Sequence, residues 1–196
     1  MNMNKLKLID YCPDFNQIDG WLAMDEAQHL FSLARETLKG SIVEIGSYRG
    51  RSTVALGLGS LVGNKSPVYA IEPHEIFKGQ LGGEFGPNDK VYFFNNIIKY
   101  SLQSIVRLIN LSSEIVSVGW KIPISLLWID GDHRYEAVYR DFYCWEQYLE
   151  VNAKIVFDDA KNVNLGSTIF IKELLNTKRY KVIHQIGKTV TLQKNF

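Results

Sequence analysis

Acidic side chains follow several short apolar runs in this sequence of 196 residues. Glu44 and Glu72 each follow such a run, and the segments "DGD" (130–132) and "DD" (158–159) close two more. Buried carboxylates of like charge repel one another and raise each other's pKa, so a sheet has no structural need to gather them. They are suited to holding a cation, to accepting hydrogen bonds from hydroxyl groups and to removing a proton. These positions are therefore the first candidates for chemistry.

A glycine-containing loop follows Glu44 in the segment "SIVEIGSYRGRSTVAL" (41–56). Gly46 comes directly after an apolar run and would let a ligand approach the backbone closely. The helix expected to begin near Arg51 offers free N–H groups and the positive end of its dipole. The spacing from Gly46 to Gly50 departs from the G-x-G-x-x-G pattern of dinucleotide-binding loops. Three interpretations of the loop remain: it binds an adenosyl group, it binds a phosphate, or it is an ordinary tight turn.

Glu72 closes the second apolar run. A carboxylate at this position can accept hydrogen bonds from both hydroxyl groups of a ribose. We expect it beside Gly46, because parallel strands end at the same edge of a sheet. Two alternatives are that Glu72 only caps the turn before Pro73, or that it binds the ribose of NAD, since NAD enzymes use an acidic residue in the same way.

The apolar pattern alternates between strand-like runs and helix-like segments. The expected strands are 41–46, 67–73, 104–110, 124–132 and 153–160, with a final hairpin over 180–194 that turns at Gly187 and Lys188. The expected helices are 25–40, 51–63, 89–102, 112–120, 135–150 and 167–177. Segment 74–90 is rich in glycine and lacks periodicity, which predicts a surface loop that covers the substrate.

Strands that alternate with helices predict an α/β fold with a parallel sheet and helices on both faces. The final hairpin adds an antiparallel edge. Helical spacing predicts that Leu38, and Tyr135, Tyr139 and Phe142 on a later helix, face the core. Ligands bind at the carboxyl ends of the strands in such sheets, so the acidic strand ends should meet at one site.

Bulk composition excludes several classes of protein. Hydrophobic residues make up 46% of the chain and charged residues 22%, which is typical of a globular domain. The net charge of +1 gives no reason to expect nucleic acid or an anionic membrane as a partner. The two cysteines lie far apart, and no apolar stretch has the length of a signal peptide or a membrane span. We expect one cytoplasmic domain in a reducing compartment.

From Gly20 to about Ala160, the sequence resembles the small bacterial methyltransferases related to macrocin-type sugar O-methyltransferases, within class I of the S-adenosylmethionine-dependent enzymes. The resemblance rests on the ordered motifs "VEIGSYRGRST", "AIEP", "LLWIDGDHRYEAVYRDF" and "IVFDDA". The first contains the E-x-G-x-x-x-G loop of that class. One departure is that "EVNAK" replaces a Gly-Gly turn, where Asn152 can adopt the left-handed conformation instead.

This resemblance implies a Rossmann-like, doubly wound, seven-stranded, mostly parallel sheet with S-adenosylmethionine as methyl donor. The implied cofactor-binding positions are Glu44, Gly46, Ser47, Tyr48, Gly50, Arg51, Ser52, Glu72, Ser112 and Asp130. Among them, Tyr48, Arg51 and Ser52 would contact the methionine carboxylate. Glu72 would bind the ribose, and Ser112 would lie near the adenine.

The resemblance also implies a metal site in one branch of the family, with Asp130, Asp158 and Asp159 as ligands. Three carboxylates at adjacent strand ends suit Mg²⁺, which would hold two hydroxyl groups and lower the pKa of one. Asp132 is the first candidate for the base and His133 the second, because imidazole titrates near neutral pH.

Simpler roles remain open for the same acidic residues. Asp130 would then contact only the cofactor, Asp132 would cap the following helix, and the pair 158–159 would be turn residues.

The predicted function is methylation of a small-molecule hydroxyl, on a sugar or a polyol, with or without Mg²⁺. The chain would form a single domain, with a helical cap over 1–40, a core over 41–196 and the cover loop 74–90. The rivals are an NAD(P)-dependent oxidoreductase and an inactive ligand-binding member of the fold. Expected partners are the acceptor and, as one option, a second copy of the chain, with no nucleic acid and no membrane.

Overall fold

The structure is a computed structural model that describes residues 6–195. The first five residues of the predicted cap and the last residue of the predicted core lie outside the described range. A seven-stranded sheet runs through the molecule in the order β5-β2-β1-β6-β7-β9-β8. Strands pair in parallel from β5 to β7, and β9 pairs antiparallel with β7 and β8. The predicted Rossmann-like sheet with a C-terminal hairpin is confirmed.

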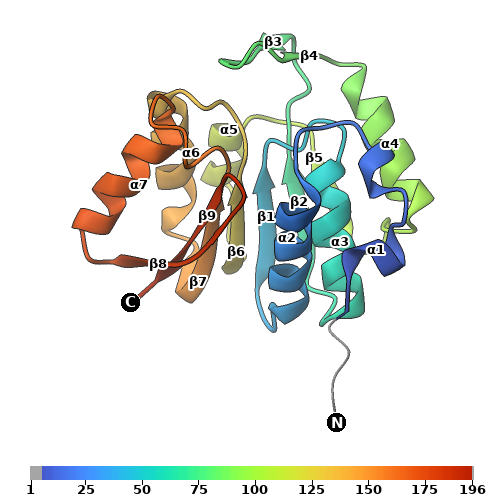
Figure 1. Cartoon of the computed structure of the whole chain (residues 1–196), viewed down its shortest axis with the longest axis horizontal. Coiled ribbons are helices and arrows are strands. Elements are labelled where there is room, and N and C mark those ends of the chain that lie inside the picture. Colours follow the sequence, from blue (N-terminus) through green and yellow to red (C-terminus); the bar gives the residue numbers. More distant parts are fainter. Residues whose placement is uncertain (1–5, 196) are drawn as a thin grey trace.

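The sheet is built from β1 (Ser41–Ile45), β2 (Val68–Ile71), β5 (Val106–Ile109), β6 (Ile124–Ile129), β7 (Leu149–Phe157), β8 (Tyr180–Ile186) and β9 (Thr189–Lys194). The helices are α1 (Leu8–Tyr11), α2 (Met24–Glu36), α3 (Arg51–Val62), α4 (Asp89–Lys99), α5 (Ser113–Val118), α6 (Tyr135–Glu146) and α7 (Gly166–Asn176), with a 3₁₀ turn at Phe15–Gln17. Helices α1 to α4 cover one face of the sheet and α5 to α7 the other (Figure 1). Within residues 6–195, no helix combines the length and apolar character needed to cross a bilayer.

Successive residues of the central strands enter two separate cores. Ile42 and Trp128 pack with α1 to α4, whereas Val43 and Ile129 pack with α6 and α7. This alternation follows from the two-residue period of a strand. Because both faces are covered, these strands are continuous apolar runs, which is why they are readily found in the sequence.

Two expectations about the helices are wrong. Helix α2 ends at Glu36, so Leu38 lies beyond it and is 74% exposed. On α6, Phe142 is buried as predicted, but Tyr139 is exposed, because the buried stripe runs through Val138, Phe142 and Trp145. The predicted stripe followed the aromatic side chains and therefore lies to one side of the face of α6 that is buried.

The boundary between α6 and β7 also differs from the prediction. The helix ends at Glu146, and the strand begins at Leu149 rather than near Ala153, because Leu149 already pairs with Ile124 of β6. Pairing within the sheet overrides the helical preference of this segment. Asn152 has the expected left-handed conformation, with a φ of 66°.

Segment 74–90 contains a short antiparallel pair, β3 (Phe77–Lys78) with β4 (Glu84–Phe85), where a loop without strands was expected. Helix α4 begins at Asp89, where the expected helix 89–102 begins. Figure 1 shows β3 and β4 above the carboxyl ends of the parallel strands. The segment is therefore positioned over the edge of the sheet where the acidic strand ends meet.

Candidate active site

The candidate site lies where the strand order reverses, between β1 and β6. Gly46 follows β1 with a φ of 84°, and a Cβ added to it would lie 2.2 Å from the carbonyl oxygen of Asp130. Only glycine fits both the left-handed backbone and this close approach. The ends of β1 and β6 diverge toward different helices beyond this contact, which is where open α/β sheets bind ligands.

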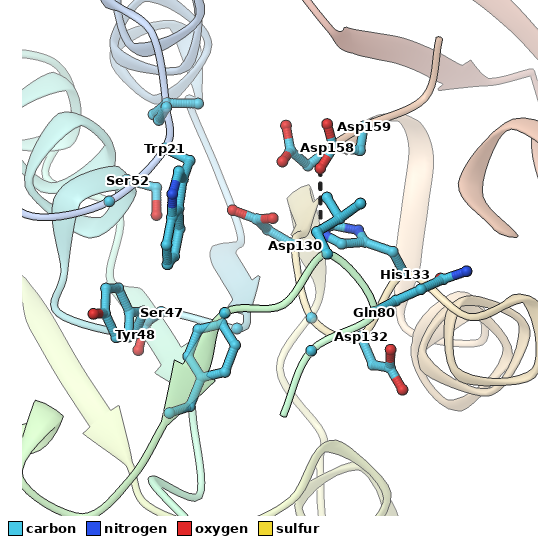
Figure 2. A pocket seen from close by; sticks show the side chains of 18 of the residues that line it. Trp21, Ser47, Tyr48, Ser52, Gln80, Asp130, Asp132, His133, Asp158 and Asp159 are labelled. Carbon is cyan, nitrogen blue, oxygen red and sulfur yellow. Dashed lines mark ion pairs between the residues drawn. The ribbon is translucent and has the colours of Figure 1, made fainter. Parts of the chain in front are cut away.

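A cavity of about 620 Å³ opens at this point (Figure 2). Of the predicted residues, its wall contains Gly46, Ser47, Tyr48, Arg51, Ser52, Asp130, Asp132, His133, Asp158 and Asp159. A second cavity of about 270 Å³ shares part of that wall and adds Glu72 and Ser112. The two predicted residues that line neither cavity are Glu44 and Gly50.

The loop after β1 contains a polar group that has no hydrogen-bond partner within residues 6–195. Gly50, with a φ of 86°, precedes the first residue of α3, so the positive end of this helix is directed at the loop. The Ser47 hydroxyl is buried in the cavity wall and has no hydrogen-bond partner among the described residues. Leaving such a group unsatisfied costs about 1–3 kcal/mol, so a polar ligand atom fits at this position.

The carboxylate of Glu72 is held by two backbone groups. Its oxygens accept hydrogen bonds from the N–H of Tyr48 and the N–H of His74, each at 3.1 Å. His74 in turn places Nε2 2.9 Å from the carbonyl oxygen of Tyr48. Each Glu72 oxygen keeps a lone pair, and the residue lines the smaller cavity, so the arrangement suits the predicted ribose hydroxyls.

Glu44 lies below the cavity and not in its wall. Its carboxylate is fully buried, and its two oxygens accept hydrogen bonds from the hydroxyls of Ser52 and Thr53. Burial raises the pKa of Glu44 to about 7, although the two hydroxyls oppose this shift. The geometry gives Glu44 a role in positioning Ser52, in place of the predicted direct contact with the cofactor.

Arg51 lines the cavity, but its guanidinium is bound to the N-terminal segment. Nε donates to the carbonyl oxygen of Leu22 at 2.8 Å, Nη1 donates to the carbonyl oxygen of Ile18, and the group lies over the ring of Phe15. This arrangement differs from the predicted contact with a carboxylate. Arg51 instead fastens the segment before α2 to the start of α3.

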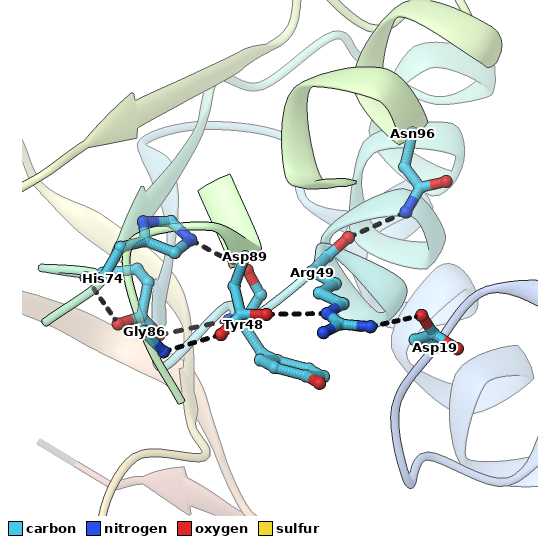
Figure 3. A network of polar contacts seen from close by, with 8 residues as sticks. Asp19, Tyr48, Arg49, His74, Gly86, Asp89 and Asn96 are labelled. Carbon is cyan, nitrogen blue, oxygen red and sulfur yellow. Dashed lines mark hydrogen bonds and ion pairs between the residues drawn. The ribbon is translucent and has the colours of Figure 1, made fainter. Parts of the chain in front are cut away.

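Arg49 joins the loop after β1 to α4 and to the cover segment (Figure 3). Its guanidinium pairs with Asp19 at 2.6 Å and with the buried Asp89 at 2.7 Å. The second oxygen of Asp89 accepts a hydrogen bond from the N–H of Gly86 at 2.8 Å. The side chain of Asn96 donates to the carbonyl oxygen of Arg49 at 2.8 Å. These contacts fix the shape of the loop after β1 through residues that line neither cavity.

The acidic strand ends do meet, and a lysine lies among them. The ammonium of Lys188 is 2.6 Å from Oδ2 of Asp158 and 3.3 Å from Oδ1 of Asp159. The pKa of Asp130 is raised well above its ordinary value, first by burial and then by the charge of Asp158. Burial lowers the pKa of Lys188, but the neighbouring carboxylates outweigh it and raise the pKa overall, which keeps the ammonium charged.

The two candidate bases have different surroundings. Asp132 accepts hydrogen bonds from the backbone and the guanidinium of Arg134, the latter at 2.6 Å. His133 lies with Nε2 3.3 Å from Oδ2 of Asp159, as Figure 2 shows. A histidine oriented by a carboxylate is a common arrangement for accepting a proton, so the geometry favours His133 over the first-ranked Asp132.

The predicted metal ligands do not fit Mg²⁺ as a set. Asp158 and Asp159 both direct an oxygen at the ammonium of Lys188, so two of the three carboxylates already hold a cation. The potential ligand atoms that converge within 4.8 Å belong to Asp130, His133 and Asp158, and not to Asp159. Mg²⁺ prefers oxygen ligands and repels a neighbouring ammonium.

An aromatic cluster covers the cavity. Trp21, which is 64% exposed, stacks on Tyr48 with ring centroids 5.4 Å apart. Phe85 from β4 meets both rings edge-on, and Phe77 from β3 lies against Phe85. Three distant parts of the chain therefore form one apolar wall over the open side of the cavity.

The prediction of the site residues missed Lys188 and Asp141. Lys188 occupies a hairpin turn, where a lysine is ordinary, and its acidic partners lie about thirty positions earlier in the chain. Asp141 follows helical spacing and lines the smaller cavity, and burial raises its pKa to about 6. Lys188 belongs to no motif, and Asp141 lies within the segment 126–142 that carries the resemblance but has no residue type or spacing that singles it out there.

Comparison with known proteins identifies the family. Residues 43–160 match the family model described as a methyltransferase domain. A Bacillus cereus O-methyltransferase solved in complex with SAH is similar at 15% identity, over 95% of this chain and 91% of that chain, with a TM-score of 0.70. SAH-bound methyltransferase PaMTH1 from Podospora anserina is similar at 15% identity, over 96% and 87% of the two chains, with a TM-score of 0.71.

A third similar structure is CalS11, a TDP-rhamnose 3'-O-methyltransferase in calicheamicin biosynthesis. It matches at 13% identity, over 85% of this chain and 76% of that chain, with a TM-score of 0.64. These structural likenesses agree with the observed sheet order and hairpin. The family model spans most of the chain, from β1 to the residues just after β7, and includes both acidic strand ends of the cavity. The chain therefore belongs to the family of methyltransferase domains.

Proposed function

We propose that this chain transfers a methyl group from S-adenosylmethionine to a hydroxyl oxygen of a small molecule, with sugars and polyols as the acceptor class. The observation that carries the proposal is that one cavity joins two features. The first is the loop after β1, with the buried and unpartnered hydroxyl of Ser47. The second is the pair formed by His133 and Asp159. A donor and a base would therefore face the same cavity.

The binding surfaces are arranged in the order that an adenosyl donor requires. Ser47 and the start of α3 suit a charged methionine end. Glu72 suits the ribose hydroxyls, and Ser112 and Asp141 line the far part of the smaller cavity, where the adenine would lie. The SAH complexes of the similar Bacillus cereus and Podospora anserina proteins support this choice of donor.

The acceptor would occupy the larger cavity, between the acidic strand ends and the aromatic cluster. Carboxylates can accept hydrogen bonds from several hydroxyl groups at once, and Trp21 presents a flat apolar face to the other side of a ring. The similarity to CalS11, a sugar O-methyltransferase by its description, supports the same acceptor class.

S-adenosylmethionine supplies, when bound, a methyl group attached to a positively charged sulfur. Asp159 holds Nε2 of His133, which leaves Nδ1 to accept the proton of the acceptor hydroxyl. The acceptor oxygen forms a bond to the methyl carbon as the carbon–sulfur bond breaks, and the electron pair of that bond stays on the sulfur. The proton ends on His133, and the products are a methyl ether and S-adenosylhomocysteine.

Calorimetric titration of S-adenosylhomocysteine and of NAD tests the donor. We expect the first to bind and the second not to bind. The Ser47→Ala variant should weaken binding by about tenfold, or about 1.4 kcal/mol, because it removes the hydroxyl that meets the ligand. Binding of NAD without binding of S-adenosylhomocysteine would refute the proposal.

Turnover with a panel of sugars and polyols tests the base. We expect His133→Gln to lower kcat by about 100-fold with unchanged affinity for S-adenosylhomocysteine, in the range that general bases contribute. Asp132→Asn is the matched control and should have a much smaller effect. The opposite ranking of the two variants would return the role of base to Asp132.

A further inference from the structure

We propose that the ammonium of Lys188 is the resident cation of the acidic end of the cavity, and that methyl transfer needs no divalent metal. The inference rests on the proposed function, which it deepens by naming the group that binds the acceptor oxygen. Lys188 lies in the turn of the hairpin β8–β9, outside the region that the family model matches.

The ammonium contacts two of the three carboxylates that the predicted metal site would use. It lies 2.6 Å from Oδ2 of Asp158 and 3.3 Å from Oδ1 of Asp159, so it contacts both carboxylates of the "DD" segment. A dication bound by the same oxygens would be in direct contact with a positive charge. The two carboxylates of the "DD" segment therefore already share a cationic partner that the protein itself supplies.

The backbone of Lys188 is held on two sides, which distinguishes it from a mobile surface lysine. Its N–H donates to Oε1 of Glu26, on α2, at 2.7 Å, and its carbonyl oxygen accepts a hydrogen bond from the N–H of Ala160 at 2.9 Å. Gly187 adopts a φ of 55°, and a Cβ there would lie 2.2 Å from the same Glu26 oxygen. The turn is therefore built to direct the Lys188 side chain at the carboxylates.

Lys188 and Asp158 keep polar atoms that can form hydrogen bonds with an acceptor molecule. An ammonium has three N–H donors; one donates to Oδ2 of Asp158, and the ion pair with Asp159 at 3.3 Å engages at most one more. Oδ1 of Asp158 is buried and has no hydrogen-bond partner within residues 6–195, although the residue lines the cavity. We assign the third N–H of Lys188 to the acceptor oxygen that is methylated, and Oδ1 of Asp158 to a second hydroxyl of the same molecule.

Lys188 would then assist the step without a change in its own protonation. The acceptor hydroxyl gives its proton to His133, and the developing negative charge on the oxygen is stabilised by the hydrogen bond from the ammonium. The carbon–oxygen bond forms as the carbon–sulfur bond breaks, so no additional reactant is required. This charge stabilisation is the chemistry that a metal ion would otherwise supply.

Binding of Mn²⁺, followed by electron paramagnetic resonance and calorimetry, tests the assignment without reference to activity. The variants are Lys188→Met and, as a matched control, Lys154→Met, which removes a lysine on β7 that pairs with the exposed Glu36. We expect the wild type and the control not to bind Mn²⁺ in the millimolar range. Lys188→Met should bind it at least about tenfold more tightly, because the carboxylates lose their cation.

Turnover is the second readout. Wild-type activity should be unchanged by EDTA, and Lys188→Met should lose about 100-fold in kcat, as expected for removal of one donor to a developing oxyanion. Lys188→Arg keeps the positive charge and, like the wild type, should not bind Mn²⁺. This variant keeps the inference testable if Lys188→Met does not fold. Tight Mn²⁺ binding by the wild type, or loss of its activity in EDTA, would overturn the inference. A failure to bind S-adenosylhomocysteine would refute only the proposed function.

Discussion

Glu26 accepts a hydrogen bond from the backbone N–H of Lys188 at 2.7 Å and thereby joins the first turn of α2 to the turn of the C-terminal hairpin. Its other carboxylate oxygen accepts a hydrogen bond from the N–H of Ala23 at 2.8 Å. The side chain is buried, and the two segments that it joins come from opposite ends of the chain. One carboxylate therefore starts a helix and also fixes the residue that brings a positive charge into the cavity.

Glu26→Ala should lower the free energy of unfolding by about 2–3 kcal/mol, because it leaves two backbone N–H groups without their charged acceptor. Urea unfolding monitored by circular dichroism measures the change. Glu36→Ala, which removes only one partner of a surface ion pair, should cost less than about 1 kcal/mol. Glu26→Gln keeps one acceptor oxygen, which can serve only one of the two N–H groups, and should recover about half of the loss. Equal effects of the two alanine variants would argue against a special role for Glu26.

Gly46→Ala should abolish binding of S-adenosylhomocysteine and lower stability by at least about 2 kcal/mol. The left-handed backbone alone costs an alanine about 1–2 kcal/mol, and the added methyl group would collide with the carbonyl of Asp130. Calorimetric titration and thermal unfolding report the two effects separately. Gly119→Ala is the control, since its φ is −95° and no atom lies near the position of the new Cβ. That variant should stay within about 0.5 kcal/mol of the wild type.

Glu44→Gln should change how stability depends on pH. Burial raises the pKa of Glu44 in the folded protein to about 7, from an ordinary value of 4.5. The folded state therefore binds this proton more tightly than the unfolded state does. The resulting stabilisation is complete below the ordinary pKa and is lost as the pH rises through 7.

The Gln variant has no proton to lose at this position. Its unfolding free energy, relative to that of the wild type, should increase by about 2–3 kcal/mol from about pH 5 to about pH 8. Urea unfolding at a series of pH values measures this difference. A constant difference across the series would show that Glu44 titrates as an ordinary carboxyl group.

Arg49→Met should weaken binding of S-adenosylhomocysteine by about tenfold, which is about 1.4 kcal/mol. The reason is that the loop after β1 loses its ion pair with Asp89 of α4. Stability should fall by about 2 kcal/mol, since the buried carboxylate of Asp89 loses a charged partner. Calorimetry and urea unfolding test the two effects. Lys154→Met removes a surface ion pair and should change neither quantity appreciably. Unchanged affinity in Arg49→Met would mean that the loop keeps its shape without this network.

The resemblance predicted the seven-stranded, mostly parallel sheet, and the local pattern predicted most elements, because central strands buried on both faces appear as unbroken apolar runs. The acidic strand ends were also visible, since parallel strands bring their carboxyl ends to one edge. The boundary between α6 and β7 was not predictable in the same way. Leu149 joins the strand only because Ile124 is available as its partner, and this contact is not local in sequence.

The sequence by itself determined the α/β fold, the loop around Gly46 and the edge of the sheet where chemistry is possible, because each depends on residues close together in the chain. Tertiary structure alone decided which groups meet there. It buried Glu44 below Ser52, turned Arg51 toward the N-terminal segment and brought Lys188 to Asp158. Charges interact through space, so the character of a carboxylate depends on neighbours that folding supplies. A hairpin turn that reads as ordinary therefore provides the cation of the site.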